Sequence, residues 1–78
     1  MEEVIKFLTA MSKMSLAGFE ANYHTFAMDE AANGVNEDLV EWSKSQDFKE
    51  LKDLYDAKNW FRGSARAKEL IQKYSGEV

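Results

Sequence analysis

The sequence predicts an all-α fold, a compact bundle of four to five helices in a single domain over residues 1–78. Proline is absent and glycine occurs only four times, so few residues interrupt a helix. Apolar residues recur at spacings of three and four, whereas the alternation typical of strands is missing over any useful length. A hydrophobic content of 45% is too high for a disordered chain.

Two apolar stripes mark the N-terminal region. The first contains Val4, Phe7, Leu8, Met11 and Met14, and the second contains Leu16, Phe19, Tyr23 and Phe26. At about 100° per residue the stripes are offset by one residue, so they do not share a helical face. We therefore predict a long N-terminal helix that is broken or bent near residues 12–15.

Local signals divide the rest of the chain. We expect Gly34 to end the N-terminal region in the left-handed conformation, and Asn36 to cap a short helix that runs to about residue 44. Asp47 and Glu50 have the spacing of a capping box at the start of the next helix. Gly63 predicts the end of that helix, after which a last helix covers about residues 65–74.

Composition argues against most catalytic and metal chemistry. The chain has no cysteine and one histidine, so thiolate zinc sites, disulfides and cysteine nucleophiles are excluded. His24 lies in a helical segment without the context of a serine nucleophile, which favours a surface or half-buried structural role. We expect no catalytic residue, no metal and no cofactor, and hence a protein that is not an enzyme.

The same sequence favours the cytoplasm over a membrane. No apolar run approaches the roughly 20 residues that span a bilayer. The acidic start of the chain lacks the basic flank of a secretory signal. We therefore expect a cytoplasmic protein with no membrane association.

Charge is distributed unevenly along the chain. Residues 29–56 hold nine acids and three bases, and residues 57–78 hold two acids and five bases. We predict an acidic face that could meet the basic surface of a partner protein, with Trp42 as an aromatic anchor. Its candidate residues are Glu37, Asp38, Glu41, Trp42, Glu50 and Asp53.

A second, basic face is predicted on the C-terminal helix. Its candidate residues are Trp60, Arg62, Arg66 and Lys73. Arginine beside aromatic residues is favoured both in binding hot spots and on nucleic-acid surfaces. The net charge of −4 argues against a dedicated nucleic-acid binder.

These observations favour a non-enzymatic protein-interaction module. We expect a small acidic regulator or inhibitor that occupies the surface of a larger protein, such as one that processes nucleic acids, as inhibitors from phages and mobile elements do. One alternative is a nucleic-acid-binding regulator that uses the basic C-terminal helix. Another is a structural subunit of a helical oligomer, such as a homodimer, which would supply buried area that 78 residues alone scarcely provide.

Overall fold

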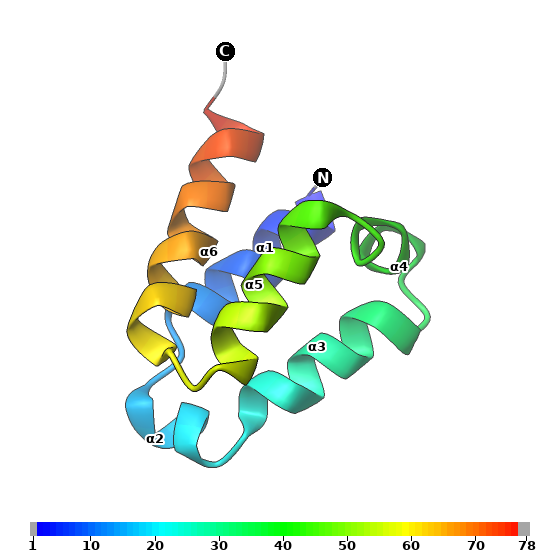
Figure 1. Cartoon of the computed structure of the whole chain (residues 1–78). Coiled ribbons are helices and arrows are strands. Elements are labelled where there is room, and N and C mark those ends of the chain that lie inside the picture. Colours follow the sequence, from blue (N-terminus) through cyan, green and yellow to red (C-terminus); the bar gives the residue numbers. More distant parts are fainter. Residues whose placement is uncertain (1, 77–78) are drawn as a thin grey trace.

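Six α-helices follow one another along residues 2–76, the part of the chain that the computed structural model describes, and no strand occurs among these residues. The helices, labelled in Figure 1, are α1 (Glu2–Ser12), α2 (Leu16–Glu20), α3 (Tyr23–Asn33), α4 (Glu37–Trp42), α5 (Gln46–Asp56) and α6 (Trp60–Ser75). The predicted all-α fold is confirmed. The expected count of four to five helices is too low.

The N-terminal region forms three helices, where we expected one long helix broken or bent near residues 12–15. The chain leaves α1 after Ser12, and Ser15 caps α2 by accepting a hydrogen bond from the backbone N–H of Gly18 at 3.0 Å. A second interruption, which the sequence did not predict, follows at residues 21–22. There Asn22 adopts the left-handed conformation with φ of 66°, which asparagine tolerates better than most residues.

This second interruption changes which side of α3 faces the core. The buried residues of α3 are His24, Met28 and Ala31. Of the predicted second stripe, only Phe19 is buried, whereas Leu16, Tyr23 and Phe26 are exposed. The second stripe therefore does not form one core face, because its residues belong to two separate helices.

Gly34 ends α3 and Asn36 begins α4, but only Asn36 has the conformation that we predicted. The Asn36 side chain accepts a hydrogen bond from the backbone N–H of Leu39 at 3.1 Å and caps α4, as expected. Gly34 is not left-handed, since its φ is −83°. Glycine fits there because a Cβ atom would lie 2.3 Å from the backbone oxygen of Glu30.

The starts of the last two helices also differ from prediction. Ser45, rather than Asp47, caps α5 by accepting a hydrogen bond from the N–H of Phe48 at 3.3 Å. Asn59 caps α6, so Gly63 lies inside this helix and does not stop it. A Cβ atom on Gly63 would approach the ring of Tyr55 to 2.8 Å, which shows how closely α6 packs on α5.

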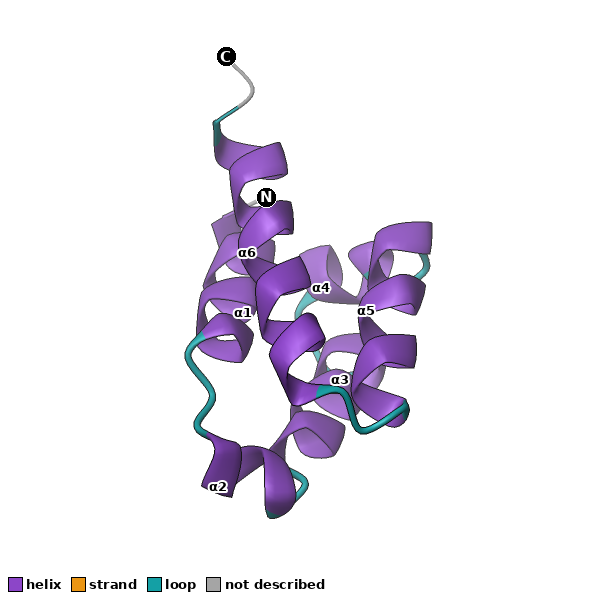
Figure 2. Cartoon of the chain, turned by 60° about the vertical axis from the view of Figure 1, so that its left-hand side comes forward, coloured by secondary structure: helices purple, strands orange, loops and turns teal. Residues whose placement is uncertain are grey.

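The core lies where α6 packs against α1 and α5, with α4 completing it beside α1. Figures 1 and 2 show the start of α1 and the end of α6 at one end of the molecule and α2 at the opposite end. The radius of gyration is 11.5 Å, and the helix pair α3–α4 forms a side layer. The buried apolar residues are Val4, Leu8, Met11, Phe19, Met28, Ala31, Trp42, Phe48, Leu51, Tyr55, Ala67 and Leu70.

Candidate functional site

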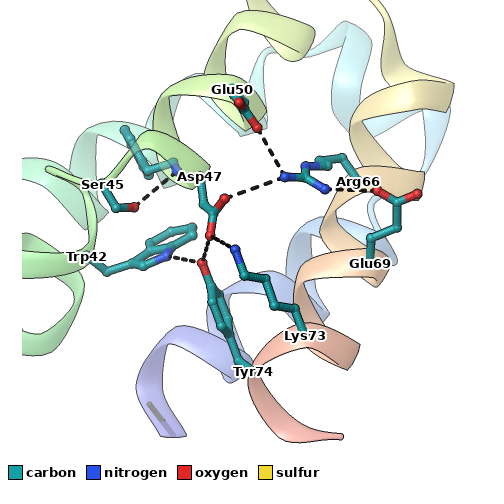
Figure 3. Close-up of polar contacts among 9 residues, drawn as sticks. Trp42, Ser45, Asp47, Glu50, Arg66, Glu69, Lys73 and Tyr74 are labelled. Atoms are coloured by element: carbon teal, nitrogen blue, oxygen red, sulfur yellow. Dashed lines mark hydrogen bonds and ion pairs between the residues drawn. The ribbon is translucent and has the colours of Figure 1, made fainter. Parts of the chain in front are cut away.

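A polar cluster joins α4, α5 and α6 around the carboxylate of Asp47 (Figure 3). Tyr74 donates a hydrogen bond to Asp47 Oδ2 at 2.5 Å, and Lys73 Nζ lies 3.0 Å from the same oxygen. The indole N–H of Trp42 donates to the Tyr74 hydroxyl at 2.9 Å. Because α5 begins at Gln46, Asp47 lies in its first turn, where the helix dipole also favours a negative charge.

Arg66 is surrounded by three carboxylates in the same cluster. Its guanidinium lies 3.1 Å from Glu50, 3.1 Å from Glu69 and 3.5 Å from Asp47. The positive charges of Arg66 and Lys73 are thus largely compensated within the molecule. These contacts link α5 to α6 and reduce the net positive charge that α6 presents to an external phosphate.

Titration behaviour supports a structural role for this cluster. The hydrogen bond from Tyr74 lowers the pKa of Asp47, and Lys73 and Arg66 act in the same direction against the effect of burial. Burial, together with the hydrogen bond to Asp47, raises the pKa of Tyr74 to about 12. Asp47 therefore stays charged and Tyr74 stays protonated near neutral pH, so neither group exchanges a proton there.

Both tryptophans differ from the exposed anchors expected from the sequence. Trp42 is only 6% exposed and packs edge-on against Phe7 and Phe48. Trp60 is half-buried, and its indole N–H donates to the backbone oxygen of Met14 at 2.9 Å. The interpretation of Trp42 as a partner-binding anchor needs correction, because the ring fills the core and its N–H is already paired.

The predicted acidic face divides between two parts of the molecule. Glu37, Asp38 and Glu41 are exposed on α4, where Glu41 makes a long contact of 3.9 Å with Lys44. Asp53 is exposed on α5, whereas Glu50 pairs with Arg66. The predicted acids thus belong to two helices, Glu37, Asp38 and Glu41 to α4 and Glu50 and Asp53 to α5.

The predicted basic face retains one exposed arginine. Arg62 is exposed near the start of α6, beside Phe61, which is also exposed. Arg66 and Lys73, one and nearly three turns further along the helix, belong to the cluster around Asp47. The structure therefore brings Arg66 and Lys73 together on carboxylates of α5 and leaves Arg62 apart from them.

Exposed apolar side chains on α2, α3 and the loop to α4 were missed from the sequence. Tyr23 is 60%, Phe26 70% and Val35 100% exposed, and Leu16 is also exposed. All four lie between Lys13 and Lys44, a stretch that contains six acids and no lysine or arginine. The gap between these two lysines is the signal that could have located this surface.

Two hollows lie between α1 and the layer formed by α2, α3 and α4, which is called the α2–α4 layer below. One, of about 310 Å³, is lined by Phe7, Ala10, Ala27, Glu30, Ala31, Val35, Asn36 and Leu39. The other, of about 380 Å³, is lined by Ala10, Met14, Ser15, Ala17, Gly18, Ala21 and Tyr23. Both include Ala10, and together they are called the Ala10 groove below; Glu30 is the only charged residue that lines either hollow.

His24 lies on the inner side of α3. Its imidazole is 3% exposed and forms a three-ring cluster with Phe19 and Tyr55, at centroid separations of 4.6 and 5.5 Å, while Phe19 and Tyr55 are 5.9 Å apart. Its Nδ1 atom has no hydrogen-bond partner among residues 2–76. Burial, followed by the charge of Lys58, lowers its pKa. His24 is therefore a buried aromatic core residue, more deeply placed than the sequence suggested.

Within residues 2–76, no group of three or more histidine, aspartate or glutamate side chains is arranged to hold a metal ion. None of the helices described is both long and apolar enough to cross a membrane. Comparison of the chain with family models, curated proteins and solved structures finds no match in any of the three.

Proposed function

We propose that this protein is a non-enzymatic interaction module, a small acidic regulator or inhibitor that occupies a basic surface of a larger protein. One observation carries the proposal. The stretch between Lys13 and Lys44, which forms α2, α3 and α4, combines exposed apolar side chains with six acids and neither lysine nor arginine. Exposed apolar groups next to charge of one sign are typical of surfaces that bind a complementary partner.

The charges on the opposite side favour this surface over the basic one. Arg66 and Lys73 are compensated by carboxylates of α5 and α6, whereas Glu30, Glu37 and Asp38 are exposed and make no ion pair within residues 2–76. Uncompensated carboxylates steer a basic partner toward the surface that carries them. Enzymes that process nucleic acids offer such basic surfaces, since they neutralise phosphates with lysine and arginine.

The anchors of this interaction differ from those that the sequence suggested. Trp42 is in the core, so apolar contact with a partner would come from Tyr23, Phe26 and Val35. Aromatic side chains contribute large contact areas at a modest entropic cost. Glu37, Asp38 and Glu41 keep their proposed role as carboxylates that face the partner.

A matched pair of charge reversals tests the proposal. Glu30 and Asp53 are both exposed, and each stands three residues before the last residue of an eleven-residue helix. Immobilised wild-type protein should capture a basic protein from native lysate, with capture decreasing as salt is raised. Glu30→Lys should reduce capture at least about tenfold, whereas Asp53→Lys should leave it nearly unchanged.

Two results would refute the proposal. One is equal capture by the wild type and by Glu30→Lys, because the α3 carboxylates would then be irrelevant to binding. The other is a captured protein whose contacting surface is acidic or whose binding does not respond to salt. Circular dichroism of both variants provides the control that each reversal leaves the helices intact.

A further inference from the structure

The Ala10 groove is apolar and is built largely from small side chains. Ala10, Ala27 and Ala31 come from α1 and α3, and Phe7 and Leu39 close one end from α1 and α4. Beyond Ala10 the groove continues along Ala17, Gly18 and Ala21 of the α2 region. Small residues allow the backbone of a bound segment to approach closely, and an elongated apolar groove suits the apolar face of a helix.

The charge around the groove determines which sign of charge its occupant should carry. Glu30 is the charged residue that lines it, and the α2–α4 layer on that side carries no base between Lys13 and Lys44. On α1, Lys6 is paired with Glu3 at 3.5 Å, and Lys13 adds one positive charge after the helix. The surroundings of the groove are thus acidic overall.

A second copy of the chain fits this charge poorly. In a two-fold dimer the same surface of each subunit contributes to the interface. The α2–α4 layer, with six acids and no base, would then be brought close to an identical layer. The net charge of −4 on each chain adds to this repulsion.

We propose that the Ala10 groove binds an amphipathic helix of the partner protein, with the helix's apolar stripe against Ala10, Ala27 and Leu39 and with lysine or arginine beside Glu30. Apolar residues at positions i, i+3 or i+4, and i+7 of the bound helix would enter the two hollows in succession. This inference rests on the proposed function and identifies the part of the partner that is recognised.

Three synthetic peptides of about 15 residues, the length at which isolated helices begin to be stable, provide the probe. The first has a leucine stripe flanked by lysines, the second replaces the lysines with glutamates, and the third keeps the lysines but disperses the leucines. Fluorescence anisotropy with the full chain should show binding of the first peptide and at least about tenfold weaker binding of the other two. Equal binding of the first and third peptides would overturn the proposal, since charge alone would then account for the affinity.

Two alanine variants locate the binding. Ala10 and Ala65 are both exposed and helical, on α1 and α6 respectively, and lysine has a high helix propensity, so either substitution should leave the fold intact. Ala10→Lys places a long side chain where the two hollows meet and should weaken binding of the first peptide at least about tenfold. Ala65→Lys adds the same charge elsewhere and should leave that binding within about twofold of the wild type. Equal effects of the two variants would place the site elsewhere.

The outcome separates this inference from the proposed function. If Glu30→Lys abolishes capture of the natural partner while the first peptide fails to bind, the proposed interaction module is supported and the proposed helix-binding groove is refuted. Light scattering tests whether a second copy of the chain occupies the groove instead. A dimer that Ala10→Lys dissociates would show that a second copy covers the groove and would overturn the proposal.

Discussion

The indole N–H of Trp42 and the hydroxyl of Tyr74 form a 2.9 Å hydrogen bond between residues 32 positions apart in the sequence. The same hydroxyl donates to Asp47, so one chain of hydrogen bonds links α4, α6 and the first turn of α5. This link holds the last turn of the short α4 helix against the core and thereby fixes the position of the acids on its outer side.

Removing the Tyr74 hydroxyl should weaken the fold. Tyr74→Phe leaves the Trp42 N–H and the Asp47 carboxylate each without a partner that they have in the wild type. We expect a loss of about 1–3 kcal/mol in the free energy of unfolding, measured by urea denaturation. Tyr23→Phe is the control, because Tyr23 is 60% exposed and should change stability by less than about 0.5 kcal/mol. Equal stability of the two variants would show that the Tyr74 link contributes nothing.

Gly63 and Gly18 should respond in opposite ways to alanine. A Cβ atom on Gly63 would lie 2.8 Å from the Tyr55 ring, which is buried and cannot move freely. We expect Gly63→Ala to destabilise the protein by about 1–3 kcal/mol. At Gly18 the nearest atom would be 3.3 Å away, on the exposed Tyr23 side chain, so the better helix propensity of alanine should make Gly18→Ala neutral or stabilising by up to about 1 kcal/mol. Thermal denaturation that ranks the two variants the other way would contradict the proposed close packing of α6 on α5.

His24 should make the fold sensitive to mild acid. Burial and Lys58 lower the pKa of His24 below its ordinary value of 6.5, while Asp56 opposes this shift. The unfolded chain therefore binds more protons as the pH falls, so stability is complete above about pH 6.5 and decreases below it. Asp47 does not contribute in this range, because its pKa is lowered from 3.8 and the stability it provides is lost only in stronger acid.

The pH dependence can be measured by urea denaturation between about pH 8 and pH 5. The wild type should lose stability toward pH 5, and His24→Phe, which keeps an aromatic ring beside Phe19 and Tyr55, should lose much less. Parallel curves for the two proteins would show that His24 is not responsible.

Binding to nucleic acid should be weak or absent. Arg66 and Lys73 are paired with Asp47, Glu50 and Glu69, which leaves Arg62 as the cation of the predicted basic face that makes no ion pair within residues 2–76. We expect no mobility shift of duplex DNA or single-stranded RNA at low salt, where electrostatic binding is strongest. A salt-sensitive shift that Arg62→Glu removes would instead support the nucleic-acid-binding alternative.

The helical fold could be predicted because its signals are local. The absence of proline, the apolar spacing of α1 and the Asn36 cap each act within a few residues. Whether a side chain points into the core or outward depends on contacts with residues that are distant in the sequence. Trp42 turns inward because Phe7, Phe48 and Tyr74 surround it, and Gly63 lies within a helix because Tyr55 packs on it.

The candidate surface was harder to predict than the fold. Tyr23 and Phe26 have the spacing of a core stripe, and only the left-handed Asn22 before them turns that stripe outward. The charges of Arg66 and Lys73 suggested a binding face because their partners on α5, Asp47 and Glu50, are 16 to 26 residues away. In contrast, the absence of bases between Lys13 and Lys44 is visible in the sequence, and it coincides with the exposed apolar residues.

Nuclear magnetic resonance of the isotope-labelled full chain, titrated with the lysine-flanked leucine-stripe peptide, tests the central claim most directly. The backbone amide signals that move most should belong to Ala10, Ala27, Glu30, Val35 and Leu39, which line one hollow of the Ala10 groove. Largest shifts around Arg62 and Phe61 on α6, or no shifts at saturating peptide, would contradict it.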